Sequence, residues 1–150
     1  MFTLVSLLIA DDNKDFDINL FNSIKKYNNN INILGISING LDTYKKIKEL
    51  KPDIVLLDIK MPILNGFQII EKLVADNIVI PKIIIVTGNY ELLSNFNHSN
   101  FIYGILFKPI DYCNLNKILN SIIQEKTLNK FNYEILKILS NFDFNKKSRG

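Results

Sequence analysis

The sequence predicts an α/β fold of the doubly wound (βα)5 type: a three-layer sandwich around a parallel five-stranded sheet, plus an extra C-terminal helix. Five short apolar runs alternate with helical patterns along the chain. The runs are rich in β-branched residues and almost continuously apolar, as expected for strands that are covered on both faces. A length of 150 residues is enough to bury one such core without disulfides or metal ions.

Each element is predicted from its own pattern. The expected strands are residues 4–10, 31–38, 53–58, 82–87 and 101–107. Five helices are expected where apolar residues recur three and four positions apart. These stripes are Leu20, Phe21, Ile24 and Tyr27; Leu41, Tyr44 and Ile47; Phe67, Ile70, Leu73 and Val74; Leu92, Leu93 and Phe96; and Leu115, Ile118, Leu119 and Ile122. Pro52 ends the second helix, and the fourth stripe is the weakest because it lies in an Asn-rich segment.

The last part of the chain differs in charge and pattern. Residues 1–126 carry 13 basic and 13 acidic side chains, so the net charge of +3 falls wholly on residues 127–150. A sixth apolar stripe follows there, made of Phe131, Ile135, Ile138, Leu139 and Phe142. We therefore expect a domain at 1–126, a joint near Glu125–Asn129 and a basic helical tail at 127–150. The tail either packs on the domain or begins a truncated output domain.

Composition excludes several classes of protein. No apolar run approaches the 18 residues of a membrane span, so no membrane partner is expected. The opening MFTLVSLLIA lacks a basic start and runs into an acidic pair, which favours a buried strand over a signal peptide. The single Cys113 indicates a reducing compartment, the cytoplasm. The chain has one arginine, so the neutral main body is not expected to bind nucleic acid.

Polar side chains follow the ends of four predicted strands. Asp11 and Asp12 follow the first strand, Asp58 ends the third, Thr87 ends the fourth and Lys108 follows the fifth. Taken singly, each has an ordinary explanation as a helix cap, a turn or a solvated charge. The carboxyl ends of parallel strands form one crevice, however, so these five side chains should converge there.

This set of side chains suits phosphoryl transfer. Clustered carboxylates raise one another's pKa, and a divalent cation relieves the repulsion. Sites for Mg²⁺ typically use few protein oxygens and retain water. Zinc ligands are scarce, because the chain has one cysteine and its single histidine, His98, lies in another segment. A carboxylate beside Mg²⁺ and a lysine can attack phosphorus to form an acyl phosphate. The sequence therefore predicts a Mg²⁺-dependent phosphoacceptor site.

The motifs, in this order, resemble the receiver domain of two-component response regulators. The resemblance covers roughly residues 3–126. It is carried by the pair Asp11-Asp12, the segment DIKMPILNG from Asp58 to Gly66, Thr87, and Lys108-Pro109. It implies the flavodoxin-like sheet order 2-1-3-4-5.

The resemblance implies a set of metal ligands around the phosphoacceptor. Asp58 would accept the phosphoryl group and contact Mg²⁺. Asp12 would be a direct ligand, whereas Asp11 would act mainly through metal-bound water. The backbone carbonyl of Lys60, two residues after Asp58, would be the third protein ligand.

The resemblance also implies how the phosphoryl group is held and sensed. Lys108, joined to Pro109 by a cis bond, would pair with phosphoryl oxygens. Thr87 would hydrogen-bond a phosphoryl oxygen after transfer and pull its loop inward. Ile105 stands where the family usually has an aromatic switch residue, with Tyr103 two residues earlier.

The implied function is signalling. The chain would take a phosphoryl group from a sensor histidine kinase or a phosphotransfer protein and switch conformation to control an output, expected to be transcription. It would not be an enzyme beyond self-phosphorylation and slow autodephosphorylation. Phosphorylation would promote a homodimer through the face of the fourth helix, fifth strand and fifth helix. The segment EILKILSNFDFNKKSRG weakly resembles the start of a sporulation-type DNA-binding output domain, so DNA would be bound only through a domain absent from this chain.

Three alternatives stay open at this point. A receiver that is never phosphorylated could act by binding alone, although the acidic set is complete. A phosphatase of the haloacid dehalogenase type would need a second Asp where Lys60 stands. A nucleotide-binding module would need a glycine-rich first turn, which ADDNKD does not provide.

Overall fold

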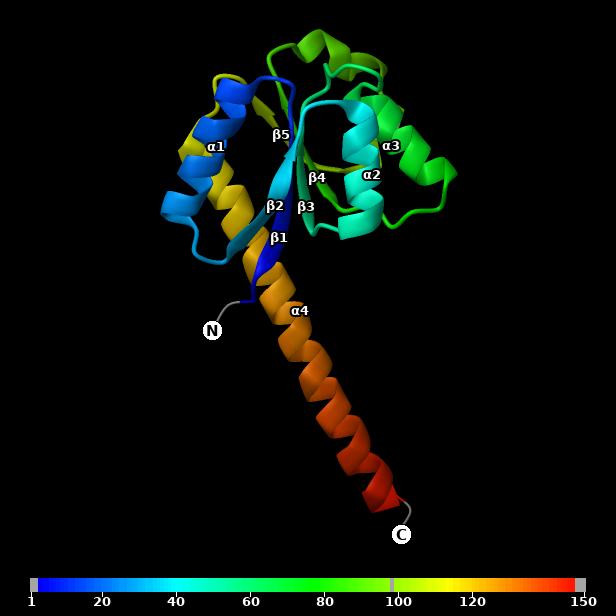
Figure 1. Cartoon of the computed structure of the whole chain (residues 1–150). Helices are drawn as coiled ribbons and strands as arrows, with labels where there is room; N and C mark the ends of the chain where they lie inside the picture. The colour runs from blue at the N-terminus through cyan, green and yellow to red at the C-terminus, as the bar shows by residue number, and fades with distance from the viewer. Residues whose placement is uncertain (1–2, 98, 148–150) are drawn as a thin grey trace.

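A five-stranded parallel sheet of order β2-β1-β3-β4-β5 forms the centre of the computed structural model, which describes residues 3–97 and 99–147 (Figure 1). The strands are β1 (Val5–Ala10), β2 (Ile31–Ser37), β3 (Ile54–Leu57), β4 (Lys82–Thr87) and β5 (Ile102–Phe107). All neighbouring pairs are parallel, so the five carboxyl ends share one edge. The predicted fold class and sheet order are confirmed.

Helices cover both faces of the sheet (Figure 1). Helices α1 (Lys14–Tyr27) and α4 (Tyr112–Lys147) pack on one face, whereas α2 (Gly40–Leu50) and α3 (Gly66–Ala75) pack on the other. Alternate strand residues supply the two cores, as the period of two along a strand requires. In β1, for example, Leu7 and Ile9 join the α1–α4 core while Leu8 and Ala10 join the α2–α3 core.

Asparagine caps begin the three helices that follow β1, β2 and β3. The side chains of Asn13, Asn39 and Asn65 accept hydrogen bonds from backbone N–H groups in the first turn of α1, α2 and α3. Asn65 and Gln68 form a reciprocal capping box. Each cap lies just beyond the carboxyl edge of the sheet, so the caps fix the helix starts around the predicted site.

The segment between β4 and β5 differs from the predicted fourth α-helix. It forms two short 3₁₀ helices, η1 (Tyr90–Asn95) and η2 (Ser99–Phe101). The segment is rich in Asn and Ser, whose side chains compete for backbone groups, and Asn89 caps η1 in this way. Its apolar residues still reach the core, where the Phe96 ring stacks on Phe67 at 4.2 Å between centroids.

No break in α4 marks the predicted joint at Glu125–Asn129, because the helix runs through these residues. The Thr127 hydroxyl donates to the Ile123 carbonyl at 2.8 Å, which keeps it within the helix. Lys126 Nζ lies 2.7 Å from Asp53 Oδ2 and ties α4 to the amino-terminal edge of the sheet. The expected C-terminal helix is therefore a continuation of the fifth rather than a separate element.

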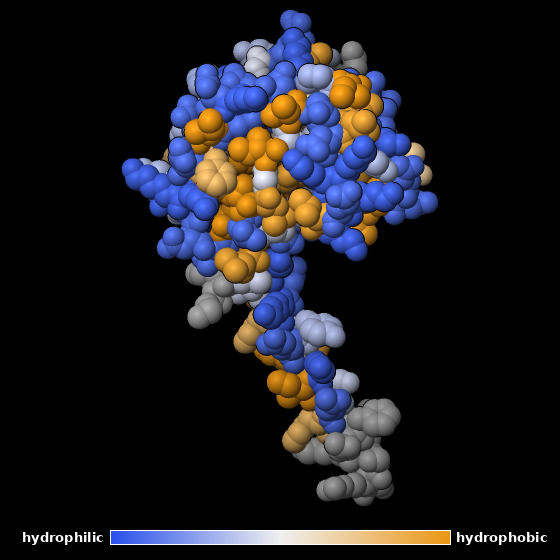
Figure 2. Space-filling model, viewed as in Figure 1, coloured by the Kyte–Doolittle hydropathy of each residue, from blue (hydrophilic) through white to orange (hydrophobic). Residues whose placement is uncertain are grey.

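Beyond this anchor, α4 projects away from the sheet (Figure 1). Residues 128–142 are all exposed, so this part of the tail does not pack on the domain. Figure 2 shows apolar side chains along one side of the projection and hydrophilic ones along the other. Within the described ranges, none of the helices is long and apolar enough to cross a membrane. Residues 148–150 of the predicted tail lie outside the described residues.

Candidate functional site

The side chains predicted from the strand ends do meet at the carboxyl edge of the sheet. A cavity of about 540 Å³ opens there, and Asp12, Asp58, Lys60, Thr87 and Lys108 are among the residues that line it. The buried carboxylate of Asp11 lies beside it and contacts the lysine. His98, which the sequence analysis set apart from the metal ligands, lies outside the described residues.

The sheet itself positions these residues through backbone hydrogen bonds. The Asp58 N–H donates to the carbonyl of Ala10 at 2.9 Å, one step beyond the end of β3. The Lys108 N–H donates to the Thr87 carbonyl at 2.9 Å, one step beyond β5. The backbone of each residue is therefore fixed by the last hydrogen bond between two neighbouring strands. The Lys108–Pro109 bond is cis, as expected.

Lys108 bridges two of the carboxylates. Its Nζ lies 2.5 Å from Asp11 Oδ2 and 3.5 Å from Asp58 Oδ2. The other oxygen of Asp11 accepts the backbone N–H of Asn13 at 2.8 Å. The ammonium also lies 4.3 Å from the centre of the Phe16 ring, a cation–π contact with the first turn of α1. Asp11 is thus the main anchor of the lysine, which stays within reach of Asp58.

The charges of the site shift two pKa values in the same direction. Burial raises the pKa of Asp58, the charge of Asp11 raises it further, and Lys108 offsets part of the rise. Burial alone would lower the pKa of Lys108, but its hydrogen bond to Asp11 and the charges of Asp58 and Asp11 raise it overall. Lys108 therefore stays an ammonium ion, while the carboxylate form of Asp58 is destabilised unless further positive charge arrives.

The site residues fit a divalent metal ion. Asp11, Asp12 and Asp58 each offer a carboxylate oxygen, and these atoms all lie within 4.8 Å of one another. Asp11 and Asp58 are buried while Asp12 is exposed. Three hard oxygen donors with one lysine leave excess negative charge, which suits Mg²⁺.

Asp17 is a neighbour of the site that the sequence analysis missed. Its side chain is 1% exposed, and neither carboxylate oxygen has a hydrogen-bond partner in the described structure. Burial, followed by the charge of Asp11, raises its pKa to about 7. An ionised carboxylate that is buried without a partner is costly, so burial favours the protonated form of Asp17. The signal was the spacing, because Asp17 falls on the core-facing stripe of Leu20 and Ile24.

The loop after β3 shapes the floor of the site. A Cβ atom on Gly66 would lie 2.7 Å from the carbonyl oxygen of Asp58 and 3.1 Å from the Cα of Ile59, so a side chain does not fit. The Gly66 N–H donates to the Ile59 carbonyl at 2.8 Å and closes the loop. α3 can therefore begin directly beneath the proposed phosphoacceptor only because residue 66 is a glycine.

Thr87 is buried beside the cavity and has a local partner. Its Oγ accepts the Asn89 backbone N–H at 3.2 Å. Next to it, strand β5 carries apolar side chains that are exposed: Tyr103, Ile105 and Phe107. The Phe107 ring contacts Tyr90 of η1 edge to face, with 5.0 Å between centroids. Phe107 directly precedes the site lysine in the sequence, and the sequence analysis did not single it out.

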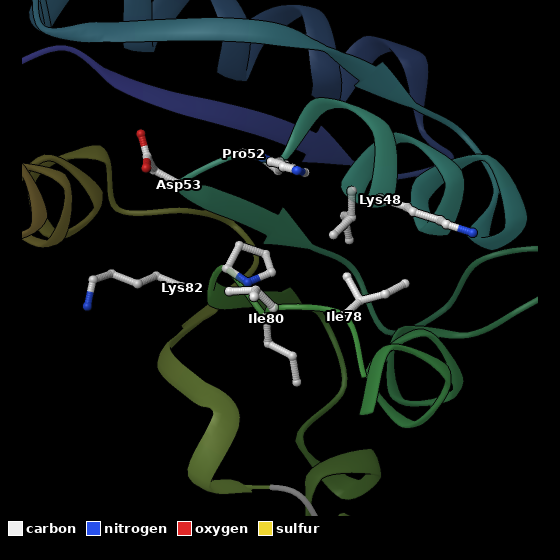
Figure 3. A pocket seen from close by; sticks show the side chains of 10 residues that line it. Lys48, Pro52, Asp53, Ile78, Ile80 and Lys82 are labelled. Carbon is white, nitrogen blue, oxygen red and sulfur yellow. The ribbon is translucent and has the colours of Figure 1, made fainter. Parts of the chain in front are cut away.

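A second cavity, of about 800 Å³, lies at the opposite, amino-terminal edge of the sheet (Figure 3). Its lining includes Ile78 and Ile80, with Lys48 and Lys82 on opposite sides. The ammonium group of Lys82 is already paired with Glu125 at 3.1 Å. The cavity contains none of the predicted site residues, so the carboxyl edge remains the candidate site.

Comparison with known proteins identifies the family of the chain. The profile of the family described as "Response regulator receiver domain" matches residues 7–120. An uncharacterised response regulatory protein of Vibrio parahaemolyticus is 36% identical over 102 residues, which cover 65% of this chain and 40% of the relative. One of Shewanella oneidensis is 33% identical over 125 residues, covering 83% of this chain and 51% of the relative.

A solved structure is similar over most of the chain. A DNA-binding response regulator of the LuxR family from Staphylococcus aureus superposes with a TM-score of 0.70 at 28% identity, covering 79% of this chain and 98% of that chain. The chain spans about half the length of the two curated relatives.

Proposed function

The chain belongs to the response regulator receiver domain family, and we propose that it accepts a phosphoryl group on Asp58 and relays a signal by changing conformation. The observation that carries this proposal is the meeting of Asp58 with Lys108 and two further carboxylates at one edge of the sheet. An aspartate with a purely structural role would not need a lysine and two further carboxylates around it.

Four groups would hold the metal ion in this proposal. They are the carboxylates of Asp11, Asp12 and Asp58 and the backbone carbonyl of Lys60. When bound, Mg²⁺ supplies positive charge that offsets the carboxylates and the oxygens of the transferred group. Above about pH 7, where Asp17 is ionised, its unpartnered carboxylate adds to the negative field that favours a cation here.

The transfer step uses Asp58 as the nucleophile. A carboxylate oxygen attacks the phosphorus of a phosphohistidine on a sensor kinase or a phosphotransfer protein. The new O–P bond forms as the N–P bond breaks, and the imidazole nitrogen keeps the electron pair and takes a proton from water. The Lys108 ammonium, 3.5 Å from Asp58 Oδ2, pairs with the phosphoryl oxygens and stabilises their charge.

In this proposal, phosphorylation changes the conformation because Lys108 and Thr87 both gain the phosphoryl group as a new partner. After transfer, Lys108 has a phosphoryl dianion to bind beside Asp11, and the Thr87 hydroxyl donates to a phosphoryl oxygen. Thr87 ends β4 before η1, and Lys108 follows β5, so both changes act on the exposed face of Tyr90, Ile105 and Phe107. This face would favour a homodimer when Asp58 is phosphorylated.

The downstream output proposed is transcription in the cytoplasm, with DNA bound through a separate output domain. The similarity to a Staphylococcus aureus DNA-binding response regulator and the greater length of the curated relatives support this proposal.

Intact mass tests the phosphoacceptor. Incubation with a small-molecule phosphodonor and Mg²⁺ should raise the mass of the chain by one phosphoryl group. The rise should vanish in Asp58→Asn and when a chelator removes Mg²⁺. An unchanged mass at saturating donor and Mg²⁺ would leave only a binding module that is never phosphorylated.

A further inference from the structure

The projecting part of α4 carries an apolar stripe that the domain does not cover. Leu128, Phe131, Ile135 and Ile138 lie on this part of the helix and are exposed by 56%, 58%, 37% and 67% of their surface. No residue from 128 to 142 is buried. Four large apolar side chains in line are unusual on a surface that only water touches.

The stripe is not a continuation of the face that packs on the sheet. Leu115, Leu119 and Ile122 form that face and are almost fully buried. Because a helix turns by about 100° per residue, the mean direction of the exposed stripe lies about half a turn away from them. The apolar face thus changes sides where α4 leaves the domain, so the stripe needs a partner of its own.

The spacing of the stripe is that of a coiled coil. Leu128, Phe131, Ile135 and Ile138 alternate steps of three and four residues, which is the a/d pattern of a heptad repeat. A stripe that packs on a sheet is broader, with three or four apolar residues in every two turns. Phe142 continues this spacing and Leu139 flanks it, so the a/d residues at the centre of the face can enter the groove of one other helix.

The charges around the stripe favour an identical helix as the partner. Lys130 and Lys137 lie more than a quarter turn from the stripe, so two copies placed side by side in parallel keep them apart. The positions that flank the seam hold Thr127, Asn132, Glu134 and Leu139, which include no lysine. In that arrangement Leu128, Phe131, Ile135 and Ile138 each meet their own counterpart.

We propose that residues 127–142 form a parallel two-stranded coiled coil with a second copy of this chain. Upstream, the same side of α4 is polar and exposed at Asn114, Lys117, Ser121 and Gln124, so contact begins only where the helix leaves the domain. At roughly 100 Å² per apolar side chain, the seam buries about 800 Å² in total. Stable interfaces bury about 1,200–2,000 Å², so the helices alone form a weak, concentration-dependent dimer.

Sedimentation over a range of concentrations tests the proposal in an Asp58→Asn chain, where phosphorylation plays no part. Ile135→Asn should weaken self-association at least tenfold. The matched control, Leu136→Asn, alters an exposed residue on another side of the same helix and should change it less than twofold. Circular dichroism confirms that each variant is folded. A monomer at every concentration, or equal effects of the two variants, overturns the proposal.

Disulfide trapping tests the parallel register. In a Cys113→Ser chain, Ile138→Cys places one thiol on the seam, so oxidation should link two copies through residue 138. Tyr133→Cys lies on the opposite side and should link at least tenfold more slowly. Equal rates overturn the proposal. Because neither experiment uses a phosphodonor, their failure and failure of the proposed function can be told apart.

Discussion

Asp11 and Asp12 are neighbours with different environments. Asp11 is 2% exposed and already pairs with Lys108 and with the Asn13 N–H. Asp12 is exposed and lines the cavity. The charge of Asp11 is thus partly balanced by Lys108, whereas the carboxylate of Asp12 is free to contact a metal ion in the cavity.

The difference predicts unequal effects on metal binding. Asp12→Ala should weaken Mg²⁺ binding at least tenfold, because a direct carboxylate ligand is lost. Asp11→Ala should weaken it less, and Asp15→Ala, an exposed residue of the first turn of α1, should leave it unchanged. Calorimetric titration measures all three affinities. Equal losses for Asp11 and Asp12 would contradict the assignment of Asp12 as the direct ligand.

Asp17 predicts a pH-dependent stability. Its pKa is about 7 in the folded chain against an ordinary 3.8. The folded state therefore binds the proton more tightly, so stability is full below about pH 4 and falls as the pH rises through 7. At about 1.4 kcal/mol per pKa unit, a rise of about 3 units corresponds to a loss of roughly 4 kcal/mol.

Asp17→Asn removes this penalty. In metal-free buffer, its gain in unfolding free energy over the native chain should grow between pH 4 and pH 7. Denaturant titrations measure the gain, with Asp15→Asn as the exposed control. A gain that is the same at pH 5 and pH 8 would show that Asp17 is not held protonated.

Among the elements, the loop from β3 to α3 is the most constrained by space. Gly66→Ala should cost about 1–3 kcal/mol of stability, because its Cβ would press on the backbone of Asp58. The same change should slow phosphorylation, since Asp58 itself must shift. Gly35→Ala is the control, because nothing lies within 4 Å of its Cβ position. Thermal unfolding and intact-mass time courses measure both effects, and equal behaviour of the two variants would contradict the role of Gly66.

The elements also show what sequence patterns can and cannot predict. Strand positions are correct to within a residue at each end, because buried parallel strands are almost uniformly apolar. The helix expected at Leu92, Leu93 and Phe96 fails, because Asn and Ser side chains compete for its backbone groups. The joint expected near Glu125–Asn129 is absent as a helix break for another reason. The apolar face of α4 changes sides there, and this change resembles a joint in the sequence, whereas the helix itself continues unbroken.

The candidate site was predictable because topology alone gathers strand ends at one edge. The sequence does not show which charged side chains of the site pair with one another. The pairing of Lys108 chiefly with Asp11 and the isolation of Asp17 depend on how α1 packs against the sheet. Such pairings arise from tertiary packing and carry no local signal.

For the whole molecule, the distribution of charge predicts weak and unspecific contact with DNA. The body is neutral and the excess of +3 lies in residues 127–150. Phosphate contacts from a few lysines give salt-sensitive binding, whereas base readout needs an element placed in a groove. Gel-shift titration should show no sequence preference and a loss of binding as salt rises. A preferred site bound by this chain would contradict the assignment of DNA binding to a separate domain.

The central claim is that Asp58, rather than any of its three acidic neighbours, is the phosphoacceptor. Borohydride reduces an acyl phosphate to an alcohol, so the modified aspartate becomes homoserine and peptide sequencing finds its position. After treatment with phosphodonor and Mg²⁺, homoserine should appear at residue 58 alone. Homoserine at Asp11, Asp12 or Asp17, or at no aspartate, would contradict the account.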